Sequence, residues 1–191
     1  MVGDALHPPY RARLRGVPTP VGHALGGLAA YLATRGDRKD WALLGASLAS
    51  ALLPDLDFLI GPFAGRSYHH YFTHSLGFAA LFFGVAYVLL CRIQRAAPWR
   101  DAWVMTGAYL SHIILDLLAK DTSPPFGVEL LWPLSDAFFI SPVAVFTDIW
   151  RGSLALLFGL HNWTAVGWEV LVLSPLVGLL WWLGRLRAQL E

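Results

Sequence analysis

The amino-acid sequence predicts an all-α integral membrane protein, a bundle of four to six hydrophobic helices. Of its 191 residues, 56% are hydrophobic and only 14% are charged, whereas a soluble domain carries roughly 25% charged residues. The hydrophobic residues also gather in blocks of about 17–25 residues, the length that a helix needs to cross a bilayer. Nine Trp and six Tyr fit side chains that anchor helices at the membrane surface.

The chain is expected to consist of a tail and one domain. Residues 1–18 form a basic N-terminal tail with Arg11, Arg13 and Arg15, expected to be irregular or to lie on the surface. The tail lacks an apolar stretch, so no cleavable signal peptide is expected. Residues 19–191 should form a single membrane-embedded helical domain. One Cys excludes an intramolecular disulfide and a Cys-based zinc site.

The first four apolar segments are expected to be antiparallel helices joined by short polar connections. Pro20 opens the first of them, in the favoured first-turn position. Thr73 is expected to cap the third. These helices should cover residues 20–34, 41–60, 74–92 and 102–119.

The C-terminal part should begin with an irregular segment, residues 120–147, which contains four Pro. Two apolar stretches follow, at residues 148–160 and 163–184. Only the second is long enough to span a bilayer. The first is therefore expected to be a re-entrant or interfacial helix.

Seven potential metal ligands stand at the ends of the apolar segments. Ionisable groups next to hydrocarbon are costly and usually mark a functional site. Consecutive antiparallel helices alternate in direction, so a start, an end, a start and an end lie on the same side of the bundle. The sequence therefore predicts that these side chains converge: His23, Asp55, Asp57, His69, His74, His112 and Asp116.

The spacing of the ligands supports a metal site. His112 and Asp116 are four residues apart and share one helical face. Asp55 and Asp57 would point apart in a regular helix, but Pro54 releases the backbone so that both can turn inward. His and Asp together suit Zn, Mn or Fe. Seven ligands suffice for two ions about 3.5–4 Å apart, as in phosphoester-cleaving enzymes.

Structural explanations stand beside the functional ones. The structural alternative for His23 alone is a packed core histidine, and for His112 with Asp116 it is a hydrogen bond between two residues of one helix. The other three histidines are not expected to be ligands. His70 should be a neighbour of the site, and the surface should hold His7 and His161.

Five short motifs occur in order along the chain. They are Pro-Thr-Pro-Val-Gly-His (18–23), Leu-Pro-Asp-Leu-Asp (53–57), His-His-Tyr-Phe-Thr-His-Ser-Leu (69–76), Ser-His-Ile-Ile-Leu-Asp (111–116) and Leu-Leu-Trp-Pro-Leu-Ser (130–135). Together they resemble the YdjM-like family of membrane-bound, metal-dependent hydrolases. The resemblance implies that the seven ligands named above form the metal-binding set.

A looser similarity links this motif pattern to zinc-dependent phospholipase C and the single-strand-specific nucleases. These are helical proteins with a multi-zinc site that cleaves phosphoesters. One position departs from the resemblance, because the family's usual Arg after the first His of the His…Thr-His motif is His70 here. If that Arg contacts an anionic substrate, this chain uses Arg66 instead or binds a different group.

The expected function is that of a membrane-bound metal-dependent hydrolase in a prokaryotic cytoplasmic (inner) membrane. It would cleave a phosphoester of a lipid or lipid-linked substrate with a metal-activated water, using one or two divalent ions, zinc before Mn or Fe. Asp55 or Asp57 is expected as general base or bridging ligand, and His74 or a free His as the group that protonates the leaving group. The irregular segment 120–147 would cover the site. Membrane lipids are the expected partners, and nucleic acid is not.

Two other functions fit the same residues. A divalent-metal or proton transporter would need a polar path that reaches both membrane faces. A membrane scaffold with a structural metal would hold it in a closed four-ligand site. An open coordination position beside a lipid-facing cleft would favour the enzyme.

Overall fold

The computed structural model describes residues 14–16, 18–34, 40–59, 63, 69–122, 124–151 and 153–190. Five long helices dominate it: α1 (Pro20–Thr34), α2 (Trp41–Leu52), α4 (Leu76–Arg92), α5 (Pro98–Leu117) and α7 (Leu160–Leu190). The smaller elements are the short helices η2 (Pro54–Leu59), η3 (Phe72–His74) and α6 (Leu154–Leu157) and the strands β1 (Leu14–Gly16) and β2 (Ile149–Arg151). The all-α class is thus confirmed.

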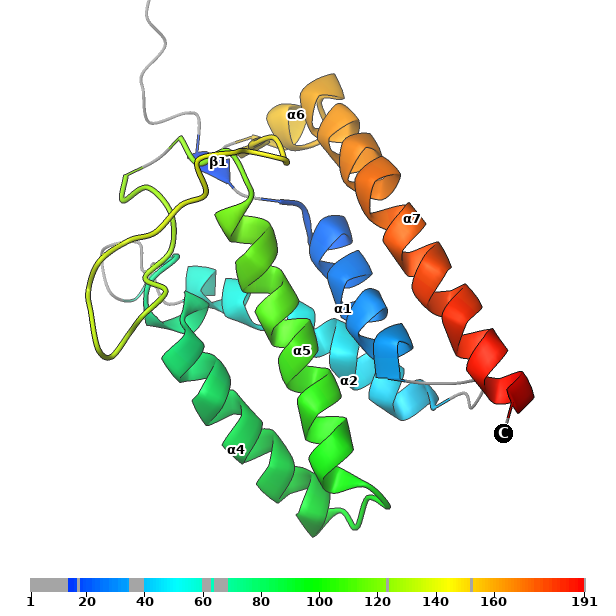
Figure 1. The fold of residues 1–191 in the computed structure, drawn as a ribbon. Coiled ribbons are helices and arrows are strands. Elements are labelled where there is room, and N and C mark those ends of the chain that lie inside the picture. The colour runs from blue at the N-terminus through cyan, green and yellow to red at the C-terminus, as the bar shows by residue number, and fades with distance from the viewer. Residues whose placement is uncertain are drawn as a thin grey trace, which may run out of the picture.

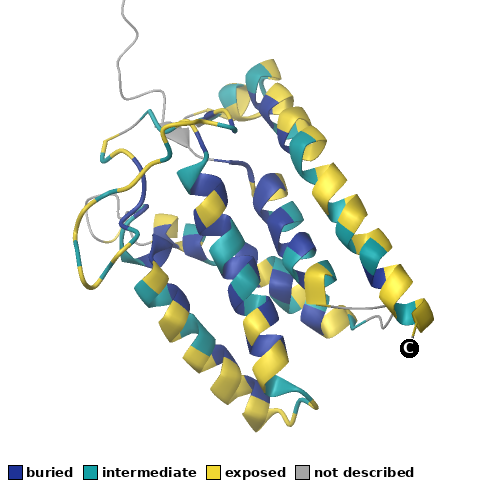
Figure 2. Ribbon diagram, viewed as in Figure 1, coloured by how far each residue is buried: buried dark blue, intermediate teal, exposed yellow. Residues whose placement is uncertain are grey.

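Helices α1 and α5 occupy the middle of the bundle (Figure 1). Helix α5 packs against α1, α2 and α4, and α1 packs against α2, α5 and α7. Buried residues face these contacts, while the outer faces of α4 and α7 are mostly exposed (Figure 2). The core is therefore a set of helix–helix contacts around α1 and α5, the two helices that carry His23, His112 and Asp116.

Helix α2 ends earlier than the sequence predicts. It stops at Leu52, and a tighter 3-10 helix, η2, follows over Pro54–Leu59. Proline has no backbone N–H, and its ring clashes with the preceding turn of an α-helix. This change of backbone turns Asp57 into the interior and leaves Asp55 partly exposed.

Helix α4 begins two residues later than a Thr73 cap would require. Ser75 is the cap, and its Oγ accepts a hydrogen bond from the backbone N–H of Phe78 at 3.0 Å. The Thr73 hydroxyl instead donates to Oδ2 of Asp57 at 3.0 Å. The predicted cap was wrong because the chain first makes the short helix η3, in which Thr73 is turned towards the interior.

The apolar stretch 148–160 does not form the helix expected for it. Its first part is β2, which pairs antiparallel with β1, so part of the tail expected to be irregular is also a strand. Ile149 and Trp150 are residue types that suit a strand. The side chain of Asn162 fixes the turn that follows: its Oδ1 accepts from the N–H of Trp150 at 2.8 Å, and its Nδ2 donates to the Trp150 carbonyl at 2.9 Å.

Among the described residues, one helical segment is long and apolar enough to cross a membrane, Leu154–Leu190. Helices α2 and α4 are apolar but shorter. Helix α5 has 20 residues but includes Arg100, Asp101 and Asp116. A bundle of four to six spans therefore stays a prediction.

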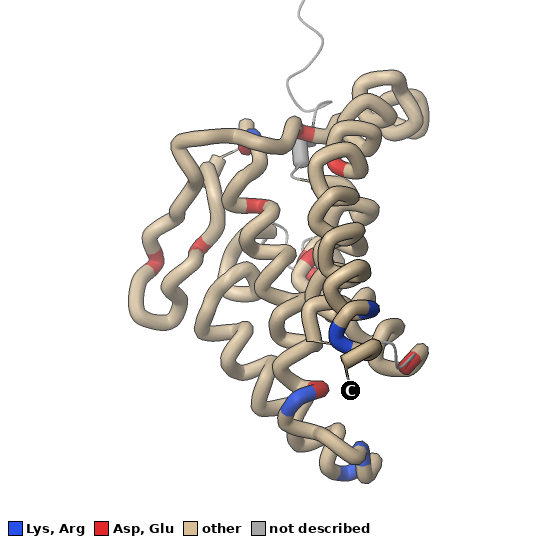
Figure 3. The backbone as a smooth tube through the Cα atoms, turned by 45° about the vertical axis from the view of Figure 1, so that its right-hand side comes forward, with Lys and Arg blue, Asp and Glu red and all other residues tan. Residues whose placement is uncertain are grey.

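Positive charge gathers at the end of the bundle that holds the α4–α5 connection and the end of α7 (Figure 3). Arg187 donates to the Ala33 carbonyl at 3.3 Å, which fixes the end of α7 beside the end of α1. Arg95 pairs with Asp101 at 2.8 Å and with Asp40. Exposed Trp side chains lie near both ends of the bundle, as expected for two interface belts: Trp41, Trp99, Trp103, Trp163, Trp168, Trp181 and Trp182.

Candidate metal centre

The structure brings all seven predicted ligands to one end of the bundle, opposite the end that holds Arg95 and Arg187. Helix α1 carries one of them, η2 carries two, the segment that ends with η3 carries two, and α5 carries two. Five of the side chains are fully buried, and only His69 (11%) and Asp55 (17%) keep some exposure. The alternating direction of antiparallel helices, inferred from the sequence, therefore correctly predicts that these side chains gather at one end of the bundle. In chain order the seven are His23, Asp55, Asp57, His69, His74, His112 and Asp116.

Three donor atoms form a compact triangle at the centre of this cluster. Nε2 of His112 lies 3.1 Å from Nε2 of His74 and 3.1 Å from Oδ2 of Asp116. Nε2 of His74 lies 3.3 Å from the same oxygen. Ligand atoms held by bonds of about 2.0–2.1 Å at the corners of a tetrahedron are about 3.3 Å apart. The triangle thus has the size of one face of a tetrahedral metal site.

Asp55 stands next to this triangle. Its Oδ1 is 3.8 Å from Nε2 of His112, and Asp55, His74 and His112 offer ligand atoms that all lie within 4.8 Å of one another. Asp55 is also the most exposed of the seven side chains. Asp55 therefore lies on the more open side of the cluster, next to the triangle.

The two imidazoles of the triangle are oriented through their other nitrogen. Nδ1 of His112 is 2.7 Å from the carbonyl oxygen of Ala51. A carbonyl can only accept, so Nδ1 donates, and Nε2 presents its lone pair to the site. Nδ1 of His74 lies 3.3 Å from Oδ2 of Asp57. Metal-ligating histidines are typically held by such an oxygen acceptor behind the ring.

Asp57 lies behind the imidazoles. Its Oδ1 is 3.0 Å from Nδ1 of His69, and its Oδ2 accepts from Thr73 and lies near His74. Burial acts to raise the pKa of Asp57, but hydrogen bonds from His69 and His74 outweigh it and hold that pKa well below its usual value. The geometry therefore favours Asp57 as the carboxylate that orients two histidines. Its predicted roles as ligand and base stay predictions.

Burial and hydrogen bonding set different proton affinities in these rings. Burial lowers the pKa of His69 to about 3, so its ring is neutral. Burial also acts to lower the pKa of His74, but hydrogen bonds to Asp116 and Asp57 outweigh it and raise that pKa to about 9. A metal ion that binds at His74 must therefore displace a proton at neutral pH.

His23 joins the cluster from α1. Its ring stacks on that of His112, with centroids 3.7 Å apart and an interplanar angle of 18°. Its Nε2 is 3.5 Å from Oδ1 of Asp116. His23, His112 and Asp116 form a further group whose ligand atoms lie within 4.8 Å of one another. His23 thus faces the site and is more than a packed core residue.

Glu169 is a buried residue near the site that the sequence analysis overlooked. From α7, its carboxylate accepts from the N–H of Thr19 at 2.7 Å, from the N–H of Gly22 at 3.1 Å and from the Thr19 hydroxyl. These bonds cap the start of α1 one turn before His23. A single carboxylate inside a long apolar helix is the signal that could have identified it.

The segment 120–147 covers the cluster from the outside, as the sequence analysis expects. The N–H of Glu129 donates to the carbonyl of His70 at 2.9 Å, and the N–H of Leu76 donates to the carbonyl of Leu130 at 2.9 Å. At Gly77 a Cβ atom would lie only 2.1 Å from the carbonyl oxygen of Trp132. Glycine is thus required for the close approach of this segment to α4.

The three remaining histidines differ in their placement. His70 is buried next to His69, with ring centroids 3.9 Å apart. His161, expected at the surface, is only 31% exposed; its Nε2 donates to the Asp148 carbonyl at 2.8 Å, and its ring stacks on Trp150. The expectations for His7 and Arg66 lie outside the described residues.

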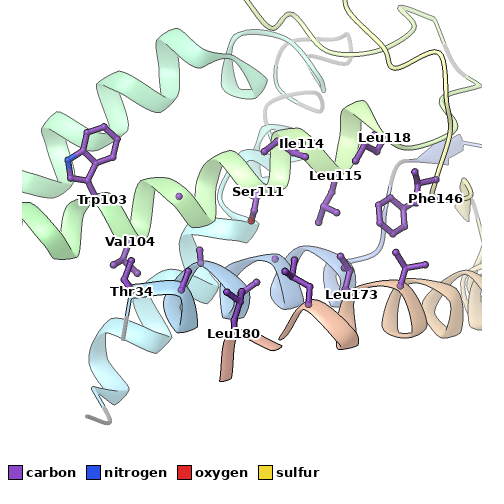
Figure 4. Close-up of a pocket in the computed structure, with 18 residues that line it drawn as sticks. Thr34, Trp103, Val104, Ser111, Ile114, Leu115, Leu118, Phe146, Leu173 and Leu180 are labelled. Carbon is purple, nitrogen blue, oxygen red and sulfur yellow. The ribbon is translucent and has the colours of Figure 1, made fainter. Parts of the chain in front are cut away.

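An apolar cavity of about 650 Å³ runs between α1, α5 and α7 (Figure 4). On α5 its lining extends from Trp103 to Leu118, about 22 Å at 1.5 Å per residue. Ser111 and Leu115, which line it, directly precede His112 and Asp116 in the chain. The cavity thus runs along α5 at the level of these two residues, although none of the seven predicted ligands lines it.

Comparison with known proteins identifies the family of the chain. The family model described as YdjM inner membrane protein matches residues 19–190. A curated relative, inner membrane protein YbcI of Escherichia coli (strain K12), is 31% identical over 184 residues, covering 88% of this chain and 100% of the relative. No solved structure matches the chain. The match covers α1 to α7 and every predicted ligand, and the chain is therefore a member of the YdjM family of inner membrane proteins.

Proposed function

We propose that this inner membrane protein is a metal-dependent hydrolase that cleaves a phosphoester of a lipid or lipid-linked molecule. The observation that carries the proposal is the triangle of His74, His112 and Asp116, whose donor atoms are 3.1–3.3 Å apart. Its His/Asp donor set fits Zn, and also Mn or Fe. A divalent ion held there would supply Lewis-acid polarisation of a phosphoryl oxygen and would lower the pKa of a water molecule to about 7, so that this water could act as the nucleophile.

The residues around the triangle take distinct roles in this proposal. His74, His112 and Asp116 hold the ion, and His23 supports Asp116 from α1. Asp55 is the general base, because its carboxylate adjoins the triangle and is the most exposed of the set. A general base must reach both water and the reacting centre. With His74 used as a ligand, its predicted role as the acid would require it to leave the triangle.

The membrane and the apolar cavity support a lipid substrate. The cavity lies beside α5, and its length of about 22 Å is more than half of a hydrocarbon core of about 30 Å. Its volume of about 650 Å³ is that of a ligand pocket. A hydrocarbon chain lying there would keep its headgroup at the end of the bundle that carries the ligands.

The exposed faces of the shorter helices support further spans besides α7. Helix α4 turns Leu81, Val85 and Leu89 outward, each more than half exposed. Such a continuous apolar face suits contact with lipid tails. We therefore include α1, α2, α4 and α5 in the membrane domain, which gives a bundle within the predicted range of four to six hydrophobic helices.

Transport is less well supported. The charged cluster lies at one end of the bundle, and the far end holds a separate group, Arg95 with Asp40 and Asp101. An apolar cluster that includes Tyr31 and Val104 lies near this far end. A transporter would need a polar path through that region. A scaffold role is also less well supported, because the ligand set exceeds the four donors of a closed structural site.

The test is hydrolysis by the full-length protein in detergent and in lipid nanodiscs, loaded with Zn²⁺, Mn²⁺ or Fe²⁺. The substrates are phospholipids, lipid-linked phosphates and simple carboxylic esters. Metal-dependent cleavage of a phosphoester lipid supports the proposal. Metal-dependent ion flux in proteoliposomes without cleavage of any substrate would replace it with the transporter.

A further inference from the structure

His70 is a buried histidine with one side of its ring left open. Only 6% of the residue is exposed. Its Nδ1 lies 3.7 Å from Oδ2 of Asp121, while its Nε2 is buried and has no hydrogen-bond partner among the described residues. A buried polar atom gives up its hydration and normally gains a partner in return. The ligand that an imidazole nitrogen commonly binds, other than a hydrogen-bond partner, is a metal ion.

Three imidazoles meet at this point. The ring of His70 lies 3.9 Å from that of His69 and 5.1 Å from that of His74, and the last two are 5.1 Å apart. Each offers a ring nitrogen within 4.8 Å of the other two. Donors at the corners of a tetrahedron around one ion, with bonds of about 2.0–2.1 Å, lie about 3.3 Å apart. The donor atoms would therefore approach one another by up to about 1.5 Å when they close around an ion.

His69 and His70 are additional to the triangle. His74, His112 and Asp116 already provide the three protein ligands of a catalytic metal site, whose fourth position would stay open for water. Oδ1 of Asp55 lies 3.8 Å from Nε2 of His112 and 3.9 Å from Nδ1 of His69, so it stands between the two sets of donors. Paired metal sites in hydrolytic enzymes hold their ions about 3.5–4 Å apart. The arrangement of the donors is that of two adjacent positions.

We propose that His70, together with His69, binds a second divalent transition-metal ion beside the one held by the triangle, with Asp55 between the two ions. This inference rests on the proposed metal-dependent function, for which a single ion is sufficient. Imidazole donors favour Zn or Fe over Mg or Ca. His70 thus becomes a ligand, whereas the sequence indicates only a neighbour.

Asp121 orients the His70 ring in this proposal. Its Oδ2 accepts from the N–H of Gly127 at 2.8 Å, which fixes the carboxylate next to Nδ1 of His70. An imidazole that turns Nδ1 to a carboxylate presents Nε2 to a metal. The same relationship joins His74 to Asp57 in the first position. Both metal positions would then use a histidine backed by a carboxylate.

The backbone conformation at His70 determines which substitution removes the imidazole without disturbing the fold. Its φ is 71°, in the left-handed region, where Asn is more readily accepted than most residues. The carbonyl of His70 also accepts from the N–H of Glu129, an interaction that no side-chain change removes. His70→Asn therefore removes the imidazole and keeps the local fold. His161→Asn is the matched control, since His161 is partly buried and hydrogen-bonded but has no place in these ligand groups.

The experiment measures the metal-to-protein ratio of full-length protein in detergent. Each variant is loaded with Zn²⁺, freed of loosely bound metal by gel filtration and analysed by mass spectrometry of its metal content. We expect about two ions per chain in the wild type and in His161→Asn, and about one in His70→Asn. The elution volume and the circular dichroism of each sample establish that the variant is folded.

A second variant tests the same inference without removing a ligand. Asp121→Asn keeps a side-chain oxygen for Gly127 and removes the negative charge beside His70. Loss of such an orienting group typically lowers metal affinity 10–100-fold. A Zn²⁺ titration by calorimetry should show that weakening for the second ion and an unchanged first ion.

The outcomes separate this inference from the proposed function. If the wild type binds one ion, or if folded His70→Asn keeps both, the second position is overturned and the hydrolase proposal stands. If folded His70→Asn loses both ions, His70 is a support for the whole cluster, and the proposal is again overturned. A wild type that binds no metal overturns the second position and the proposed function together.

Discussion

Nε2 of His74 and Nε2 of His112 lie 3.1 Å apart, although the two residues come from different elements and are 38 positions apart in the chain. In both rings Nδ1 faces an oxygen acceptor, the Asp57 carboxylate and the Ala51 carbonyl respectively. Two imidazole nitrogens that face each other at this distance need a cation between them, which is a proton in the metal-free protein and a metal ion once that proton is displaced. This one contact therefore explains why the bundle end is suited to hold a cation.

Removing a member of the triangle should abolish hydrolysis and impair binding of the ion that the triangle holds. His112→Ala deletes one donor, and Asp116→Asn weakens another by removing its charge. A lost ligand removes an interaction that supplies several kcal/mol of barrier lowering in metal-dependent hydrolysis. His161→Ala should keep nearly full activity. The measurement is the metal content and the initial rate of each variant on the same phosphoester lipid.

The variants of the triangle should remain folded. Membrane helices satisfy their own backbone hydrogen bonds, so the bundle does not depend on the metal. A monodisperse His112→Ala protein that still hydrolyses the substrate would contradict the mechanism. His7→Ala serves as a further control, because this residue lies outside the motifs that carry the ligands.

Asp57→Asn should separate an orienting role from a ligand role. Both oxygens of Asp57 contact the imidazoles of His69 and His74 or the Thr73 hydroxyl. Loss of an orienting carboxylate typically weakens metal binding about 10–100-fold. We expect the variant to reach the wild-type metal content at saturating Zn²⁺ and to show a raised Kd by titration. A permanent loss of one ion at saturation would instead make Asp57 a ligand.

Much of the site could be predicted from the sequence, because antiparallel helices alternate in direction and this alternation determines which helix ends lie together. The positions of His23 and Asp116 near helix ends, together with short antiparallel connections, were sufficient to predict that their side chains meet. The different placement of Asp55 and Asp57 could not be predicted. It depends on the path of η2 after Pro54, which turns Asp57 inward and leaves Asp55 partly exposed.

Other differences also arise from contacts distant in sequence. The stretch that follows Asp148 is apolar enough for a helix, yet it pairs as β2 with β1, more than 130 positions earlier in the chain. Glu169 was overlooked because its three donors belong to Thr19 and Gly22. No local pattern in α7 points to these partners. Hydropathy and spacing indicate which segments are helical. They do not indicate which groups that are distant in sequence form hydrogen bonds with one another.

Glu169→Ala should destabilise the protein and loosen His23. The variant leaves the N–H groups of Thr19 and Gly22 and the Thr19 hydroxyl without the carboxylate that accepts from them. Each buried donor left unsatisfied costs about 1–3 kcal/mol, so the three together should cost about 3 kcal/mol or more. The measurement is the free energy of unfolding in detergent. Leu171→Ala, an exposed position on the same helix, is the control and should change it little.

Metal affinity should rise with pH between about 7 and 9. In the metal-free protein, burial acts to lower the pKa of His74, but hydrogen bonds to Asp116 and Asp57 outweigh it and raise that pKa to about 9. Below this value the ring carries a proton that the ion must displace, so the apparent affinity should fall about tenfold per pH unit. The measurement is the apparent Kd for Zn²⁺ from pH 6 to 10. An affinity that does not change between pH 7 and 9 would show that His74 is not a ligand.

Filling the apolar cavity should impair long-chain substrates selectively. Gly107 lines the cavity on α5, and a Cβ atom there would make only an ordinary contact, 3.8 Å from Cβ of Ala30. Gly107→Leu therefore places extra carbons in the cavity and keeps the helix. Helix propensity alone favours Leu over Gly by about 0.8–1 kcal/mol, so the variant should not unfold.

The expected result is a raised KM for a substrate with a long hydrocarbon chain and an unchanged KM for a short-chain analogue with the same headgroup. Each pair of methylenes that no longer fits weakens binding by about 1.6 kcal/mol, or roughly 15-fold, so the loss should grow with chain length. Metal content should equal that of the wild type, because Gly107 contacts none of the ligands. Gly45→Leu, on the open outer face of α2, is the matched control. Equal losses for long and short substrates would mean that the cavity does not hold the hydrocarbon chain.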